Sequence, residues 1–382
     1  KALDAYIAEL TQADKIDTAR KVQVFRDDIA LQKPSANAAA PPATAKGTTS
    51  APAPSAAAKP AVRAPKMNEQ EVGEWAIATG GSVDVTFGTP PVRRTIAIAT
   101  ELPRGRFSII EMHVNCAKVP GNDLSPLASA QDVGRLHLDS SPPDKTFLDL
   151  TPLRQMTALR DVRCSDQDAA AVDVIASLSE VTFLAIGKMP EGSLEKIARM
   201  KNLEGMESPS IVGPGLAALK GCKKLRRITI RGNPNPVTDD DVRALAAALP
   251  DLEHLHFGTK NDLAPITNAC VPALLALKSL KSLHLSGKNI DDSVLETLAK
   301  LRTLEILGLE GSQVIGSGFK ALTKSVLLWQ LHLAKTPITD AALEDLAKLK
   351  PLTILTLTET AVSEAAVAKL QAALPDCKIT TK

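Results

Sequence analysis

The residues of this chain best suited to chemistry are histidines, and most of them recur at one position of a short apolar motif. The chain has 382 residues and six histidines, four of which hold the position between the last two apolar residues of the motif, as in "LHL". These four are His137, His256, His284 and His332. Imidazole titrates near neutral pH and binds transition metals, so a row of such residues predicts pH-sensitive binding or metal coordination. A row of solvated polar side chains without a specific role is the third interpretation.

Metal coordination needs imidazoles that converge with a further ligand. No carboxylate stands beside these histidines at the same position of the motif, so we predict no metal and no cofactor. The other two interpretations stay open. His254, two residues before His256, belongs to the same surface.

Trp329 and Gln330 mark the same face in a later motif. Trp329 follows the first leucine of "LWQLHL", where it is expected to face outward beside Gln330 and His332. An exposed tryptophan is a typical anchor of a protein interface. The alternative is that its ring folds over the edge of the sheet onto its neighbours.

The densest basic stretch is "KGCKKLRRITIRG" at 220–232, in which Arg226, Arg227 and Arg231 are expected to face outward. Glutamates at the matching positions of the neighbouring motifs predict cross-strand pairing that neutralises much of this charge. Because aromatic residues make up only 3% of the chain and the net charge is +2, we predict no nucleic-acid partner.

Enzyme motifs are absent from the sequence. It has no G-x-S-x-G, no H-E-x-x-H, no phosphate loop and no dinucleotide fingerprint. We therefore expect a protein that binds and does not catalyse.

The histidine motifs belong to a repeat of the form L-x-x-L-x-L. It begins at Val133, Leu159, Val181, Leu203, Leu225, Leu252, Leu280, Leu304, Leu328 and Leu352, with a degenerate last unit at "DCKIT" and a weaker unit at "FSIIEMHV" from Phe107. Alternate residues of a strand face opposite sides, so L-x-L sends two leucines inward and the residue between them outward. Helical spacing after each later strand, with Thr238, Thr339 and Ser363 as expected N-caps, predicts a strand, a turn and a helix in each unit.

This pattern resembles the leucine-rich repeat family, in which each repeat adds one short strand to a curved parallel sheet. The resemblance covers residues 106–382 and implies an α/β solenoid with a concave sheet and convex helices. A narrower resemblance, to leucine-rich repeat proteins of planctomycete-type bacteria, rests on the "EWAIATGG" and "ALPDCKI" segments and the N-terminal hairpin. The chain departs from the family where asparagine usually bonds the turn, since Ser312, Thr336 and Thr360 stand there. The turns are therefore expected to be weaker or differently made.

Outside the repeats we expect three segments. Residues 1–32 have the apolar spacing of a helical hairpin, and 33–66 form an Ala/Pro-rich flexible linker. Residues 67–105 are expected to cap the solenoid with one helix and two strands. Five widely spaced cysteines predict buried free thiols, and no apolar run is long enough for a membrane span.

These features predict a non-catalytic scaffold that binds a protein or peptide on the concave sheet, chiefly between His256 and Thr356. One alternative is a structural component of a cell envelope or large assembly, with self-association through the N-terminal hairpin. Another is a regulatory or sensor domain of a larger protein such as a kinase, because the chain begins at Lys1 without Met. The sequence leaves the compartment open, and a bacterial envelope or extracytoplasmic location is our working hypothesis.

Overall fold

The computed structural model describes residues 66–139, 147–230, 237–257 and 266–381. The chain divides after Ala61, and every described residue belongs to the second unit, Val62–Lys382. The expected hairpin at 1–32 and, apart from its last residue, the expected linker at 33–66 lie outside the described residues.

One 14-stranded sheet runs through the second unit in the order β14 to β3, followed by β1 and β2. Strands β3 to β14 are parallel neighbours, whereas β1 pairs antiparallel with both β2 and β3. Their bounds are β1 Ser82–Phe87, β2 Val92–Ile96, β3 Phe107–Asn115, β4 Arg135–Asp139, β5 Asp161–Cys164, β6 Phe183–Ile186, β7 Gly205–Glu207, β8 Arg227–Ile230, β9 His254–Phe257, β10 Ser282–Leu285, β11 Ile306–Gly308, β12 Gln330–His332, β13 Ile354–Thr356 and β14 Lys378–Thr380.

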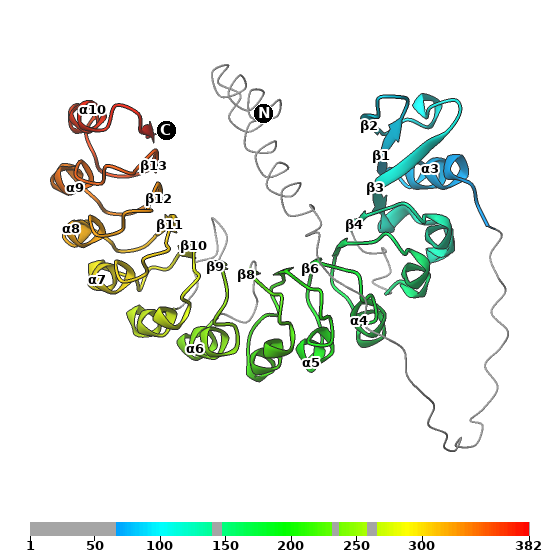
Figure 1. Cartoon of the computed structure of the whole chain (residues 1–382), viewed down its shortest axis with the longest axis horizontal. Helices are drawn as coiled ribbons and strands as arrows, with labels where there is room; N and C mark the ends of the chain where they lie inside the picture. Colours follow the sequence, from blue (N-terminus) through cyan, green and yellow to red (C-terminus); the bar gives the residue numbers. More distant parts are fainter. Residues whose placement is uncertain (1–65, 140–146, 231–236, 258–265, 382) are drawn as a thin grey trace, which may run out of the picture. The chain divides into compact units, whose positions relative to one another are not determined.

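Helices and 3-10 turns line the side of the repeats opposite the sheet (Figure 1). The α-helices are α3 Glu69–Ala78, α4 Ala169–Ala176, α5 Ser193–Ile197, α6 Asp239–Ala248, α7 Leu295–Leu298, α8 Phe319–Leu322, α9 Asp340–Leu346 and α10 Glu364–Ala373. The 3-10 turns are η1 Ala99–Glu101, η2 Cys116–Lys118, η3 Pro120–Asn122, η4 Ser125–Ser129, η5 Thr151–Gln155, η6 Pro214–Gly221, η7 Asn268–Ala276 and η8 Asp292–Val294. This arrangement makes the sheet the concave face.

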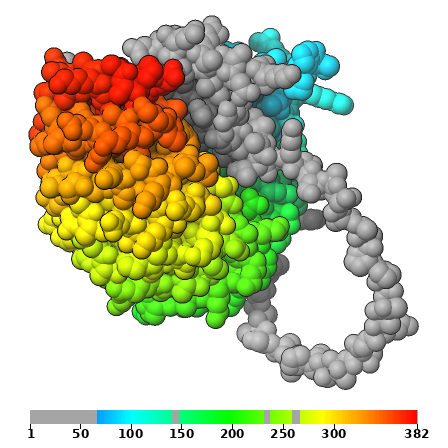
Figure 2. Space-filling view, turned by 60° about the vertical axis from the view of Figure 1, so that its left-hand side comes forward, coloured from blue at the N-terminus to red at the C-terminus, as the bar shows by residue number. Residues whose placement is uncertain are grey.

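The inward leucines form the core, as the L-x-L pattern predicted. Leu283, Leu307, Leu331 and Leu355 pair in one row of adjacent strands, and each is 0% exposed. A single unit cannot bury these side chains, so stacking of neighbouring repeats holds the fold together. Figure 2 shows the later repeats as successive layers.

The first described elements close one end of the sheet. Helix α3 begins at a capping box in which Asn68 and Glu71 each accept from the other's backbone amide, and Val72 and Ala76 on its inner side are buried. Strands β1 and β2 follow, and α3 and these two strands lie within residues 67–105.

The turns after the strands are made by hydroxyl groups and backbone bonds. The hydroxyls of Thr336 and Thr360 donate to the carbonyls of Leu333 and Leu357, at 2.6 and 2.7 Å. Backbone amides join successive turns, as from Gly311 N to Ala334 O at 2.9 Å. The repeats thus satisfy their turn backbone without the family's asparagine, which explains the departure seen in the sequence.

The expected N-caps differ in detail. Thr238 forms a capping box with Asp241, and the Ser363 hydroxyl accepts from Ala366 N, but the Thr339 side chain makes no cap bond. The five cysteines are free; four are buried and Cys164 is partly buried.

Candidate functional site

The outward positions of the strands form one continuous row across the concave sheet. Strand register joins His113 to His137, then through successive strands to His256, His284, His332 and finally Thr380. We call this line of residues the histidine row. The row holds one histidine more than the sequence analysis assigned, because His113 enters it from β3. The signal was present in "FSIIEMHV", whose spacing matches the other motifs.

The later histidines of the row lie against one another. The rings of His256 and His284 stack with centroids 4.4 Å apart, and His284 and His332 lie 5.6 Å apart. Neighbouring strands lie about 4.8 Å apart, so the paired side chains of His256 and His284 come into contact. A histidine pair of this kind is held by the parallel register, since directly paired residues on one face must neighbour each other.

Gly308 occupies the row between His284 and His332 and makes room for a carboxylate. A Cβ at this position would stand 2.2 Å from His284 Nδ1 and 2.7 Å from Glu310 Oε2, so both side chains use the space. Glu310 Oε1 lies 3.7 Å from His284 Nδ1, while Glu310 Oε2 is buried and has no hydrogen-bond partner among the described residues. Burial alone would raise the pKa of Glu310, but the hydrogen bond and charge of His284 hold it below its ordinary value.

Gln330, His332 and Thr356 form a hydrogen-bonded chain beside this group. His332 Nδ1 lies 3.0 Å from the Thr356 hydroxyl, and the Gln330 amide nitrogen contacts His332 Nε2. His332 is 7% exposed, so this chain orders a nearly buried imidazole. The bonds fit a neutral ring that donates from Nδ1 to Thr356 and accepts from Gln330 at Nε2.

Trp329 precedes β12 and is half-buried. Its amide donates to Glu305 O at 3.0 Å, and its carbonyl accepts from Thr353 N at 2.8 Å. Just before it, Val326 and Leu327 are 68% and 49% exposed. Every other repeat places at least one polar or charged residue there, as in "RT" at 302–303 and "KS" at 278–279. This repeat therefore carries an apolar segment at its exposed edge.

The expected arginine surface is only partly assembled. Arg227 lies on the outer face between Gly205 and His254, but Arg226 precedes β8 and its guanidinium donates to the carbonyls of Lys223 and Leu225, both at 3.0 Å. The acidic group beside Arg226 is Asp251, at 4.0 Å, on the loop before β9. Arg231 lies outside the described residues.

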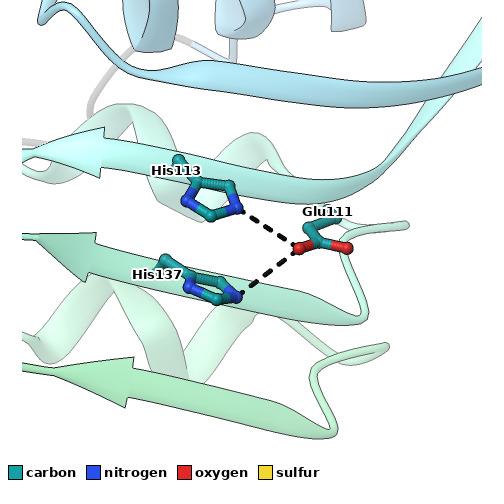
Figure 3. Close-up of side chains that lie close together, drawn as sticks. All are labelled: Glu111, His113 and His137. Carbon is teal, nitrogen blue, oxygen red and sulfur yellow. Dashed lines mark hydrogen bonds and ion pairs between the residues drawn. The ribbon is translucent and has the colours of Figure 1, made fainter. Parts of the chain in front are cut away.

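A second group of titratable side chains lies at the other end of the histidine row, and the sequence analysis did not assemble it. His113 and His137 stack with centroids 4.0 Å apart, and both Nε2 atoms face Glu111 Oε1, at 3.2 and 3.5 Å (Figure 3). Glu111 Oε2 accepts from Arg93 at 2.7 Å and from Arg135 at 3.2 Å. Among the described residues this is the one set of three or more His, Cys, Asp and Glu side chains whose ligand atoms all lie within 4.8 Å.

The pKa values of the two imidazoles shift in opposite directions. Burial alone would raise the pKa of Glu111, but the His113 hydrogen bond and the arginine charges lower it to about 2. Burial and the charges of His113 and Arg163 lower the pKa of His137 to about 4. The Glu111 hydrogen bond raises the pKa of His113 above its ordinary value. At neutral pH the group therefore holds an anionic carboxylate and a neutral His137.

A shallow, open hollow of about 430 Å³ adjoins this group. Its lining includes His137 and Asp139 of β4, Arg163 of β5 and Glu207 of β7. The Arg163 guanidinium lies 4.8 Å above the Phe183 ring and 3.1 Å from Asp161. These two contacts hold a positive charge in place on the wall of the hollow. None of the helices among the described residues has the length and apolar character to cross a membrane.

Repeats of L-x-x-L-x-L that each add a parallel strand and a convex helix or 3-10 turn define the leucine-rich repeat class. The chain has the α/β solenoid fold of leucine-rich repeat proteins.

No family model matches the chain, and no curated protein matches it. Solved structures with a similar fold include an internalin of Listeria monocytogenes, 18% identical over 68% of this chain and 76% of that chain, with a TM-score of 0.48. A leucine-rich repeat protein of Leptospira interrogans is 15% identical over 70% of this chain and 88% of that chain, with a TM-score of 0.29. The plant peptide hormone receptor RGFR1, in complex with RGF2, is 14% identical over 68% of this chain and 41% of that chain, with a TM-score of 0.40.

Proposed function

We propose that this protein is a non-catalytic scaffold that binds a protein or peptide on the concave sheet between His256 and Thr356. The observation that carries the proposal is the Glu310 carboxylate beside Gly308, whose buried Oε2 atom has no hydrogen-bond partner among the described residues. We call Gly308 and this carboxylate the Gly308 site. A buried acceptor without a donor is costly, and a partner that supplies an N–H or ammonium group would satisfy it.

The side chains around the Gly308 site suit a peptide. Stacked imidazoles border it on one side and the ordered His332–Thr356 pair on the other, so the surface combines flat rings with fixed polar atoms. The core leucines hold these groups at the strand spacing, and the outward residues are free to differ from repeat to repeat. Specificity therefore lies in the outward positions, whereas stability lies in the inward ones.

The test is a capture experiment with the full chain as bait, comparing concave and convex variants. The concave variant is Glu310→Gln with Gln330→Ala, and the matched convex control is Glu344→Ala, an exposed residue of α9. A partner retained by the wild type and the control but lost by the concave variant, with cross-links at 306–332, supports the proposal. Equal capture by both variants, or cross-links confined to the convex helices, refutes it.

One observation favours a second function, self-association as a structural component. Val326 and Leu327 stand exposed at the edge of a repeat where the other repeats are polar. Contiguous exposed apolar residues mark protein contact sites. Sedimentation velocity over a wide concentration range tests this, with Val326→Ser/Leu327→Ser as the variant. Association of the wild type that the variant loses supports it, and a monomer at all concentrations excludes it. The compartment stays a prediction.

A further inference from the structure

The group at the start of the histidine row is built by strand register. His113 of β3 pairs directly with His137 of β4, so their rings stack on the concave face. Glu111 lies two residues before His113 and therefore on the same face of β3. Its carboxylate turns toward both imidazoles, as Figure 3 shows.

The spacing of the three side chains matches a metal coordination sphere. Zinc binds histidine nitrogen and carboxylate oxygen at about 2.0–2.2 Å, so two ligands of one tetrahedral ion stand roughly 3.3–3.5 Å apart. Glu111 Oε1 lies 3.2 Å from His113 Nε2 and 3.5 Å from His137 Nε2. The three ligand atoms all lie within 4.8 Å of one another, so side-chain adjustment would bring them to one ion.

The surrounding side chains hold these ligands in orientation. Arg93 and Arg135 both bond Glu111 Oε2, which leaves Oε1 to face the imidazoles. Asp139 Oδ2 lies 3.5 Å from His113 Nδ1 and can fix the tautomer that presents Nε2. A carboxylate behind a metal-binding histidine is a common supporting arrangement.

His137 supplies a further observation that points to a ligand. Its Nε2 atom is buried and makes no hydrogen bond to the described residues. A cation bound by both this nitrogen and Glu111 Oε1 would give the nitrogen a partner.

We propose that Glu111, His113 and His137 bind a divalent transition-metal ion of the zinc type. Oε1 and the two Nε2 atoms supply three ligands, and the remaining position opens toward the hollow beside His137, where water or a partner's side chain completes the sphere. This metal site is distinct from the Gly308 site, so the metal proposal and the peptide-binding proposal can each stand if the other fails.

The later histidines provide a natural control. His256 and His284 also stack, and Glu310 Oε1 lies 3.7 Å from His284 Nδ1, but these side chains do not form a set of three ligand atoms within 4.8 Å of one another among the described residues. Stacked imidazoles on the same sheet are thus present in both places, while the converging carboxylate is present in one.

The experiment titrates the full chain with Co²⁺, follows the visible absorption of four-coordinate cobalt, and then displaces the cobalt with Zn²⁺ in a calorimeter. His113→Gln and His137→Gln remove one ligand each and keep the Arg–Glu111 pairs, while His284→Gln is the matched control. Far-ultraviolet circular dichroism establishes that each variant is folded, so a loss of binding reports on the ligand and not on the fold.

We expect the wild type and His284→Gln to bind one equivalent with the four-coordinate spectrum, and each ligand variant to lose at least about tenfold in affinity. Absence of binding by the wild type at a hundredfold excess of metal would overturn the proposal. So would binding that both ligand variants keep, or binding that His284→Gln alone loses.

Discussion

Gly308→Ala is expected to destabilise the solenoid, although alanine is the better strand residue. The backbone of Gly308 does not require a positive φ, so replacing glycine there would by itself stabilise the fold by about 0.5–1 kcal/mol. The new Cβ, however, would stand 2.2 Å from His284 Nδ1 and 2.8 Å from Cγ. Moving the base of a ring is more costly than moving the end of a chain, and the ring is stacked on His256.

The expected net effect follows from these two magnitudes. Overpacking of an ordered site costs about 1–3 kcal/mol, which exceeds the backbone gain. We therefore expect Gly308→Ala to lower the free energy of unfolding by about 1–2 kcal/mol. In a His284→Ala background the ring is gone, and only the mobile carboxylate of Glu310 meets the Cβ. There the same substitution should be neutral or should stabilise by up to about 0.5 kcal/mol.

Urea unfolding of the four proteins of this double-mutant cycle measures the coupling between positions 284 and 308. Gly134→Ala is the matched control, because the nearest atoms to its Cβ are carbonyl oxygens at 3.8 Å and nothing must move. The control should not destabilise. A cost of Gly308→Ala that is equal in both backgrounds, or that is absent in the wild type, would refute the overlap of His284 with this position.

Three further results are expected. Leu331→Ala should cost about 2–5 kcal/mol in urea unfolding, since the side chain is 0% exposed, whereas Val326→Ala at 68% exposure should change stability by less than about 0.5 kcal/mol; similar costs would contradict the inward register. Asp292 accepts hydrogen bonds from the backbone amides of Ile315 and Gly316 in the next repeat, at 3.0 and 2.9 Å. Asp292→Ala should therefore lower the free energy of unfolding by about 1–3 kcal/mol and raise hydrogen exchange at these two amides. Unchanged exchange would show that these hydrogen bonds do not form. Burial raises the pKa of the Cys270 thiol to about 12, so the thiol loses its proton at a lower pH in the unfolded state than in the folded state. Deprotonation therefore favours the unfolded state, and the free energy of unfolding should fall as pH rises above about 9. Thiol labelling followed by mass spectrometry should modify Cys270 only at the unfolding rate, and faster modification would contradict its burial.

The repeat explains why so much of the fold was predictable. Strand alternation is local, so L-x-L alone determines which side chains face inward, and equal spacing brings equivalent positions into register. The stacked His256–His284 pair follows from the same rule. Convex segments were less predictable: η5 and η6 are 3-10 turns with proline in the first turn, whereas α9 and α10 of the later repeats are α-helices.

The site was predictable only as a surface. His113 and His137 stand 24 residues apart, the spacing of the later repeats, but the first motif was aligned from Phe107, two residues out of register with the others, so their pairing was not predicted. Arg226 was expected to meet glutamates across the strands, yet it turns to loop carbonyls at the edge of the sheet. Both outcomes depend on side-chain conformations that neighbouring repeats select.

The sequence by itself determined the solenoid, its inward leucines and the outward row of histidines, because these depend on the two-residue period of a strand and on the length of the repeat. Only the tertiary structure decided that Glu111 meets His113 and His137, and that His284 and Glu310 share the space above Gly308. Such convergence depends on rotamers and on contacts between strands that are 24 or more residues apart along the chain. A local pattern cannot encode these contacts, because each is set by packing against a neighbour that arrives from another repeat.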